Sequence, residues 1–122
     1  MEQDQAVQVL GSLASGPRLD IYRLLVRQGL AGLVAGEIGA ALGVPPTNLS
    51  FHLKALVHAG LLTVTAEGRY QRYRANMALM LDVVAYLTEE CCAGHPEQCA
   101  EIRATSHCPP AVLPSLSRVP TA

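Results

Sequence analysis

Aromatic residues are scarce in this chain, which has no tryptophan, one phenylalanine and four tyrosines among its 122 residues. Proteins that hold single-stranded nucleic acids without sequence preference stack successive bases on exposed aromatic rings. A composition with only 4% aromatic residues argues against a platform of that kind. If the chain binds a nucleic acid, the expected partner is a duplex.

Long apolar runs are also missing, and none approaches the roughly 20 residues that a membrane-spanning helix needs. The first ten residues, MEQDQAVQVL, are acidic and do not resemble a secretory signal peptide. We therefore expect a cytoplasmic protein with no membrane partner. In that reducing compartment, the four cysteines at positions 91, 92, 99 and 108 are expected to be thiols or ligands instead of structural disulfides.

An excess of positive charge is absent as well, since the formal net charge is −1. The charge is unevenly distributed, however. Lys54, Arg69, Arg72 and Arg74 lie in one segment that contains a single acid, Glu67. A dimer would present two such segments, so a nearly neutral subunit can still offer a positive face to phosphates.

What the sequence does contain is helical periodicity, because 50% of its residues are hydrophobic and recur at helical spacing. The pattern predicts helices over residues 5–14, 17–28 and 35–42, with Gly39 at a close approach to the next helix. Gly43 can adopt the positive φ that ends a helix, and Pro45-Pro46 favours a new helix start. The new helix buries its leucines and leaves these residues on or beside its exposed face: Thr47, Asn48, Ser50, Phe51 and Lys54.

Two short segments rich in β-formers follow, residues 61–65 and 70–74, and the turn between them contains Gly68. Asn76 is then expected to cap a last helix that runs to about Cys92 and stops before Gly94 and Pro96. Beyond Glu101 the prolines and small residues predict a poorly ordered tail over residues 102–122. The predicted fold is mainly α with a small β-hairpin, a winged helix-turn-helix domain over residues 1–101.

The segments ASGPRLDIYRLL and GVPPTNLSFHLKALVHAGLL, the hairpin and the last helix resemble the ArsR/SmtB family of winged-helix repressors over residues 5–92. The resemblance implies a homodimer built on the first and last helices, which releases operator DNA when an effector binds. The family's DNA-contacting positions correspond to Thr47, Asn48, Ser50, His52, Arg69 and Arg72. Thr, Asn and Ser side chains suit base edges or phosphates, and wing arginines suit the DNA backbone or minor groove. His52, beside Leu53, is equally consistent with a hydrogen-bonded core or interface histidine.

Two departures from the family bear on the effector. Many metal-sensing members carry a Cys-x-Cys pair in the third helix, but residues 32–39 read GLVAGEIG, without a thiol. The Asp and His ligands that zinc sensors place along the last helix are also missing, since residues 77–90 contain no histidine. Membership of the family therefore does not identify what is sensed.

A different ligand set, Cys91, Cys92 and Cys99, lies after these positions. An unbroken helix would separate Cys92 from Cys99 by about 10 Å along its axis, but Gly94 and Pro96 allow the chain to fold back. Three thiolates without an obligatory fourth ligand suit trivalent arsenic or antimony, whereas zinc prefers a closed tetrahedron. The arrangement resembles arsenic-responsive members with three cysteines after the last helix. Neighbouring glutamates would raise the thiol pKa values, which favours binding over rapid oxidation.

Other interpretations remain open. The Cys91-Cys92 pair could be small apolar residues of a dimer interface. Zinc or cadmium could bind if His95, His107 or Cys108 supplied a fourth ligand, and the thiols could sense oxidants. A thiol-dependent arsenical or redox enzyme is disfavoured because there is no Cys-x-x-Cys motif, and a simple interaction module would not need wing arginines. We expect no enzymatic activity.

Overall fold

The computed structural model describes residues 1–107, apart from the side chains of Pro96 and Cys99. The chain separates into two units, Met1–Tyr86 and Leu87–Ala122, which are considered one at a time. In the described part, no helix is both long and apolar enough to cross a bilayer. The predicted class is confirmed, because helices dominate and the strands form one small antiparallel sheet.

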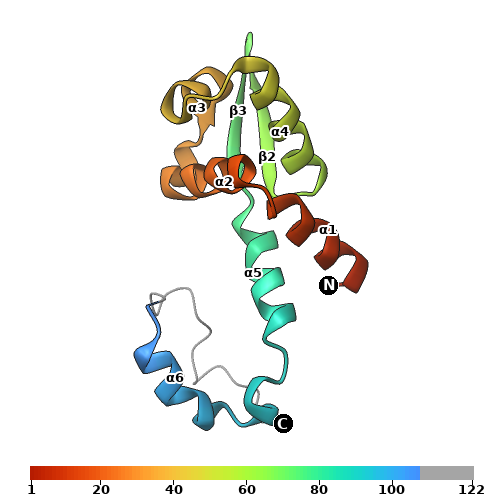
Figure 1. Cartoon of the computed structure of the whole chain (residues 1–122), viewed down its shortest axis with the longest axis vertical. Coiled ribbons are helices and arrows are strands. Elements are labelled where there is room, and N and C mark those ends of the chain that lie inside the picture. Colours follow the sequence, from red (N-terminus) through yellow and green to blue (C-terminus); the bar gives the residue numbers. More distant parts are fainter. Residues whose placement is uncertain (108–122) are drawn as a thin grey trace. The chain divides into compact units, whose positions relative to one another are not determined.

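Five helices and a three-stranded sheet make up the first unit (Figure 1). The sheet order is β1-β3-β2, and both pairings are antiparallel. Strand β1 was not predicted. The elements are α1 (Gln3–Leu13), α2 (Gly16–Gln28), the 3-10 turn η1 (Gly29–Ala31), β1 (Leu33–Val34), α3 (Ala35–Leu42), α4 (Pro46–His58), β2 (Leu62–Glu67), β3 (Tyr70–Ala75) and α5 (Met77–Leu87).

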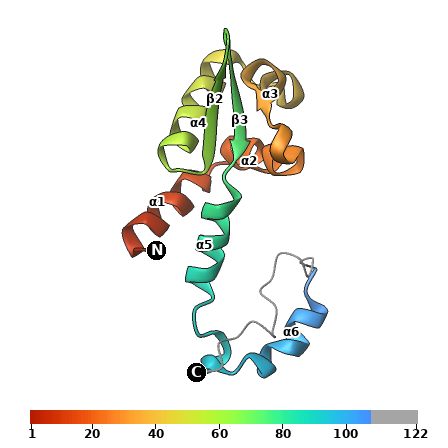
Figure 2. The same cartoon turned by 180° about the vertical axis from the view of Figure 1, so that it is seen from behind.

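A single apolar core joins α1 to α5 with the sheet. Burial of each large aliphatic side chain contributes about 1.5–3 kcal/mol before the cost of ordering the chain. Helix α4 lies along β2, and α3 contacts β3, so that the hairpin lies between the two helices when the molecule is seen from behind (Figure 2). The most deeply buried members are Val9, Ile21, Leu25, Ile38, Leu56 and Leu61.

The turn between α3 and α4 has the geometry that the sequence predicts. Gly43 ends α3 in the left-handed region, with φ 65° and ψ 31°. A Cβ on Gly39 would lie 3.3 Å from the carbonyl oxygen of Val44 and 3.4 Å from a methyl of Leu49. The predicted close approach is therefore confirmed, and α4 begins at Pro46 as expected.

The start of α5 is confirmed, but its predicted end is wrong. The Asn76 side chain accepts a hydrogen bond from the backbone N–H of Leu79 at 3.2 Å and donates one to the carbonyl of Gly60 at 2.9 Å. The helix then stops at Leu87 and does not continue to Cys92. The reason is conformational, since Glu90 has a left-handed backbone with φ 52°.

The described part of the second unit consists of short elements without a buried side chain. They are the 3-10 turns η2 (Cys91–Gly94) and η3 (Pro96–Cys99) and the helix α6 (Ala100–Thr105). Helix α6 crosses the predicted boundary at residue 101, so residues 102–105 are helical where we expected a poorly ordered tail. Residues 108–122 of that predicted tail lie outside the described residues.

Candidate nucleic-acid interface

The outer face of α4 carries the polar side chains that the sequence singled out. Thr47, Asn48, Ser50 and Lys54 are all exposed, because leucines on the opposite face anchor the helix in the core. The helix contains no acidic residue along its length. This face therefore combines hydrogen-bonding groups with positive charge, which is the chemistry that a DNA groove accepts.

His52 lies at the edge of this face and is half-buried. Its Nδ1 accepts a hydrogen bond from Nε of Arg18, on α2, at 3.3 Å. Of the two open interpretations, this contact favours the hydrogen-bonded histidine, because the ring braces α4 against α2. The sequence pattern could not identify Arg18, which is 34 residues away in the chain.

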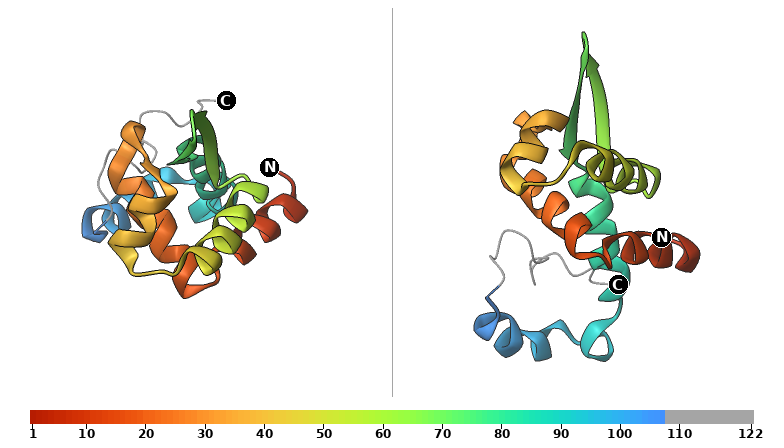
Figure 3. Two further views of the ribbon diagram at one scale, coloured as in Figure 1. Left: turned by 90° about the horizontal axis from the view of Figure 1, so that it is seen from above. Right: turned by 45° about the horizontal axis from the view of Figure 1, so that its top comes forward.

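The hairpin of β2 and β3 forms the predicted wing, and it extends beyond the helices in the side view (Figure 3). Its ladder pairs Thr65 with Arg72 and Glu67 with Tyr70, so Gly68 and Arg69 form the tip. Arg69 is exposed there. Among the two predicted wing arginines, Arg69 therefore has the placement expected of a DNA contact.

Arg72 has a different environment from the one we expected. Its Nε donates to both carboxylate oxygens of Glu67, at 3.0 and 2.9 Å, and its Nη1 donates to the carbonyl of Ala31 at 3.1 Å. The hydrogen bond with Glu67 raises the pKa of the Arg72 guanidinium. That Arg72 contacts DNA stays a prediction; in the structure its charge is paired with Glu67, and its bond to Ala31 ties the wing to η1.

Arg74 acts in the same way and was not predicted as a site residue. It donates to the carbonyl of Leu30 at 2.8 Å and to the Thr65 hydroxyl at 3.1 Å. Both arginines therefore orient the wing through backbone carbonyls of η1. Such contacts depend on strand register, so charge counting along the sequence could not find them.

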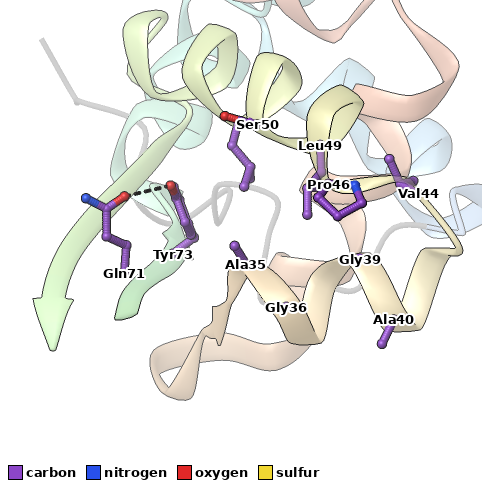
Figure 4. A pocket seen from close by; sticks show the side chains of 11 residues that line it. Ala35, Gly36, Gly39, Ala40, Val44, Pro46, Leu49, Ser50, Gln71 and Tyr73 are labelled. Atoms are coloured by element: carbon purple, nitrogen blue, oxygen red, sulfur yellow. Dashed lines mark hydrogen bonds between the residues drawn. The ribbon is translucent and has the colours of Figure 1, made fainter. Parts of the chain in front are cut away.

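A groove of about 490 Å³ separates the front of α4 from α3 and the wing strand β3 (Figure 4). Small and apolar side chains form most of its wall, and Ser50 supplies a hydroxyl. The hydroxyl of Tyr73 donates to the amide oxygen of Gln71 at 3.1 Å at the other edge. Burial raises the pKa of Tyr73. Ser50 therefore lines the boundary between helix and wing, whereas Thr47 and Lys54 lie on the outer face.

The cysteines belong to the second unit. Cys91 is exposed and Cys92 is half-buried. The expectation of reduced thiols does not hold for Cys92, which is disulfide-bonded in the structure. The predicted third ligand, the Cys99 side chain, lies outside the described residues, as does Cys108. Among described side chains, no three His, Cys, Asp or Glu groups are clustered to hold a metal ion.

The backbone around the vicinal cysteines is left-handed at three residues that are not glycine. Glu90, Cys92 and Ala93 have φ values of 52°, 56° and 56°. Side chains disfavour this region, at a cost of about 1–2 kcal/mol per residue, and such strain tends to occur at functional sites. His95 follows η2 and pairs through Nδ1 with Glu97 at 3.2 Å. The sequence located the break at Gly94 and Pro96, a few residues too late.

The fold of the first unit is similar to that of known proteins. A family model described as a helix-turn-helix domain matches residues 13–65. An ArsR-like transcriptional regulator from Rhodococcus sp. RHA1 is 28% identical, with a TM-score of 0.63, over 83% of this chain and 92% of that one. HlyU from Vibrio cholerae is 28% identical, with a TM-score of 0.55, over 71% of this chain and 97% of that one.

A third solved structure is the homodimeric winged helix-turn-helix DNA-binding domain of a possible ArsR-family regulator from Mycobacterium bovis. It is 34% identical, with a TM-score of 0.57, over 75% of this chain and 85% of that one. No curated protein sequence matches this chain.

Proposed function

This chain belongs to the ArsR family of winged-helix transcriptional regulators, and we propose from its cysteines that it is a metalloid-responsive repressor. It binds double-stranded operator DNA as a homodimer and releases the operator when trivalent arsenic or antimony binds Cys91, Cys92 and Cys99. The observation that carries the effector assignment is the disulfide at Cys92, which adjoins the exposed Cys91. The protein is a switch and not an enzyme.

The DNA-binding part of the proposal rests on two surfaces of the first unit. Thr47, Asn48 and Lys54 project from α4 and contact bases or phosphates of the major groove. Ser50 contacts the DNA from the edge of α4 that faces the wing. Arg69 at the wing tip reaches the flanking backbone. Arg72 and Arg74 hold the wing at the angle that makes this contact, since both are tied to η1.

The homodimer is supported by apolar side chains that the first unit leaves in solvent on α1 and α5. Val7, for example, is 62% exposed. Exposed apolar area is typical of a protein interface, and the similar domain from Mycobacterium bovis is homodimeric. The other large members of this surface are Leu10, Met77 and Leu81.

The thiol chemistry fits a three-coordinate soft ion. A backbone that lets Cys92 bond to another sulfur also lets two sulfurs share one larger atom. A reductant must first open the disulfide by supplying two electrons. Three thiols can then exchange with the three hydroxyls of arsenous acid, releasing water as each As–S bond forms. Cys91 is adjacent and exposed, so it can join without moving the core.

Release follows from where the thiols lie in the chain. The first of them, Cys91, comes four residues after the end of α5, which is one of the two helices that pair the subunits in this proposal. Loading the thiols must reorganise that end and change the spacing or tilt of the two recognition helices. A coupling of about 1–3 kcal/mol loosens operator binding roughly 5- to 150-fold.

One titration series tests the proposal. The reduced full-length chain is bound to a fluorescent operator duplex, kept reduced with a phosphine, and titrated in parallel with arsenite, antimonite, zinc and cadmium. Arsenite and antimonite are expected to lower the anisotropy at stoichiometric concentration, while zinc and cadmium leave it unchanged. Release by zinc or cadmium alone would replace the metalloid assignment.

The disulfide at Cys92 favours a second candidate, an oxidant-responsive repressor of the same fold. In that case the operator is released when Cys92 is oxidised and is bound again after reduction. A further arm of the titration, with peroxide and no metalloid, distinguishes the two. The metalloid proposal expects oxidised protein to keep operator affinity but lose its response to arsenite.

A further inference from the structure

Phe51, the only phenylalanine of the chain, lies on the outer face of α4 with 64% of its surface exposed. Phenylalanine is among the residue types most often fully buried, and here it lies among polar side chains instead. Its neighbours on this face are Thr47, one turn before it, and Lys54, one turn after it. The ring therefore lies in the middle of the surface assigned to the DNA groove.

The exposed ring is held in place from one side. The Arg18 guanidinium carbon lies 5.7 Å from the ring centroid, and the His52 ring meets it edge-on at 5.6 Å with an interplanar angle of 68°. Arg18 and His52 are themselves joined by the hydrogen bond at Nδ1. A cation over an aromatic face is attractive, so Arg18 and His52 hold Phe51 in an orientation that leaves its other side open.

The polar neighbours argue against a protein partner on this patch. A protein-binding surface would surround an exposed ring with further apolar side chains, whereas Phe51 is flanked by a hydroxyl and an ammonium group. In the major groove of DNA, one feature suits a phenyl ring that cannot donate or accept a hydrogen bond. That feature is the C5-methyl group of thymine.

We propose that Phe51 is a specificity-determining residue that reads the methyl group of one thymine in each operator half-site, and that Arg18 and His52 position its ring. This inference rests on the proposed DNA-binding function and deepens it. A preorganised ring loses little freedom when it meets the base. Burying one methyl group gives about a fourfold gain in affinity per half-site.

The test begins with a duplex selected from a random library by the reduced full-length chain without metalloid. Each thymine of the selected duplex is then replaced by deoxyuridine, which removes the methyl and keeps the base pair. For the natural chain, one thymine per half-site is expected to show about a fourfold loss of affinity. Failure to enrich any duplex would reject the proposed function itself, separately from the role of Phe51.

Variants of Phe51, measured on the same thymine and uracil duplexes, complete the test. Phe51→Ala and Phe51→Gln should bind the thymine and uracil duplexes equally at that position, whereas Phe51→Leu should keep part of the difference. Ile102→Ala is the matched control, because Ile102 on α6 has the same exposed fraction as Phe51, 64%, and its loss should leave the uracil profile unchanged. Circular dichroism and the melting temperature verify that each variant is folded.

Two results would overturn the assignment. In one, no thymine of the selected duplex is sensitive to loss of its methyl group in the natural chain. In the other, Phe51→Ala shows the same fourfold sensitivity as the natural chain, so a different residue reads the methyl.

Discussion

Residues 1–86 carry every buried side chain that the structure describes, whereas none of the described side chains between residues 87 and 107 is buried. The first unit is therefore held by apolar contacts among its helices and its sheet. The second has residues with a left-handed backbone, a disulfide-bonded cysteine and exposed short helices. This difference means that DNA recognition depends on packing, while the proposed response to metalloids depends on sulfur chemistry.

The largest effect is expected from a cavity in the first unit. Leu56 on α4 is fully buried, with 0% of its surface exposed, and Leu56→Ala should lower the free energy of unfolding by about 2–5 kcal/mol. Ile102 on α6 is 64% exposed, and Ile102→Ala should change the free energy of unfolding by less than about 0.5 kcal/mol. Urea denaturation measures both. Equal losses would mean that the two units share one core.

Cys92→Ser separates sensing from recognition. The serine hydroxyl cannot replace a thiolate, so arsenite should no longer release the operator, and the expected 5- to 150-fold weakening disappears. Affinity for the operator without arsenite should stay unchanged, because Cys92 lies outside the apolar core. Fluorescence anisotropy measures both quantities. If the Cys92→Ser protein still released the operator on arsenite addition, Cys92 would not be part of the metalloid site.

The two wing arginines should differ in the salt dependence of binding. Arg69 is exposed at the tip, so Arg69→Ala should weaken every duplex alike and reduce the slope of log K against log salt by about 0.9 per subunit. Arg72 is already paired with Glu67, so Arg72→Ala should change the slope less and instead loosen the wing. Binding isotherms from low to moderate salt decide this. A larger slope change for Arg72 would restore it as the phosphate contact.

The smallest effect concerns alkaline pH. Burial raises the pKa of Tyr22, whose hydroxyl donates to the Met77 sulfur at 3.9 Å. The unfolded chain ionises first, so stability from this group is complete below about pH 10 and is lost as pH rises through the higher folded pKa. Tyr22→Phe should flatten the alkaline decline in melting temperature. If the melting temperature of Tyr22→Phe fell as steeply at alkaline pH, other groups would be responsible for the decline.

Local sequence patterns predicted most of the helices and strands of the first unit. The bounds of α3, the start of α4 and the Asn76 cap could be predicted because Gly43, Pro46 and Asn76 act on their own segments. Strand β1 was missed because two residues are too few to show an alternating pattern. Its pairing with β3 depends on a partner that is about 40 residues away.

The site was predicted less completely, for the same physical reason. Exposure of Thr47, Asn48 and Lys54 follows from helical periodicity alone. The pairing of Arg72 with Glu67 requires the register of the wing, and the bond from Arg18 to His52 requires the packing of α2 on α4. The end of α5 was also misjudged, since residues 77–93 contain no glycine or proline to mark the left-handed turn at Glu90.

The most direct test of the account is the reciprocity of the two binding reactions. Arsenite affinity is measured for the reduced chain alone and for the chain saturated with operator duplex, and operator affinity is measured with and without arsenite. The account predicts that each partner weakens the other by the same factor, between about 5 and 150. Arsenite that binds free and operator-bound protein with equal affinity would contradict it.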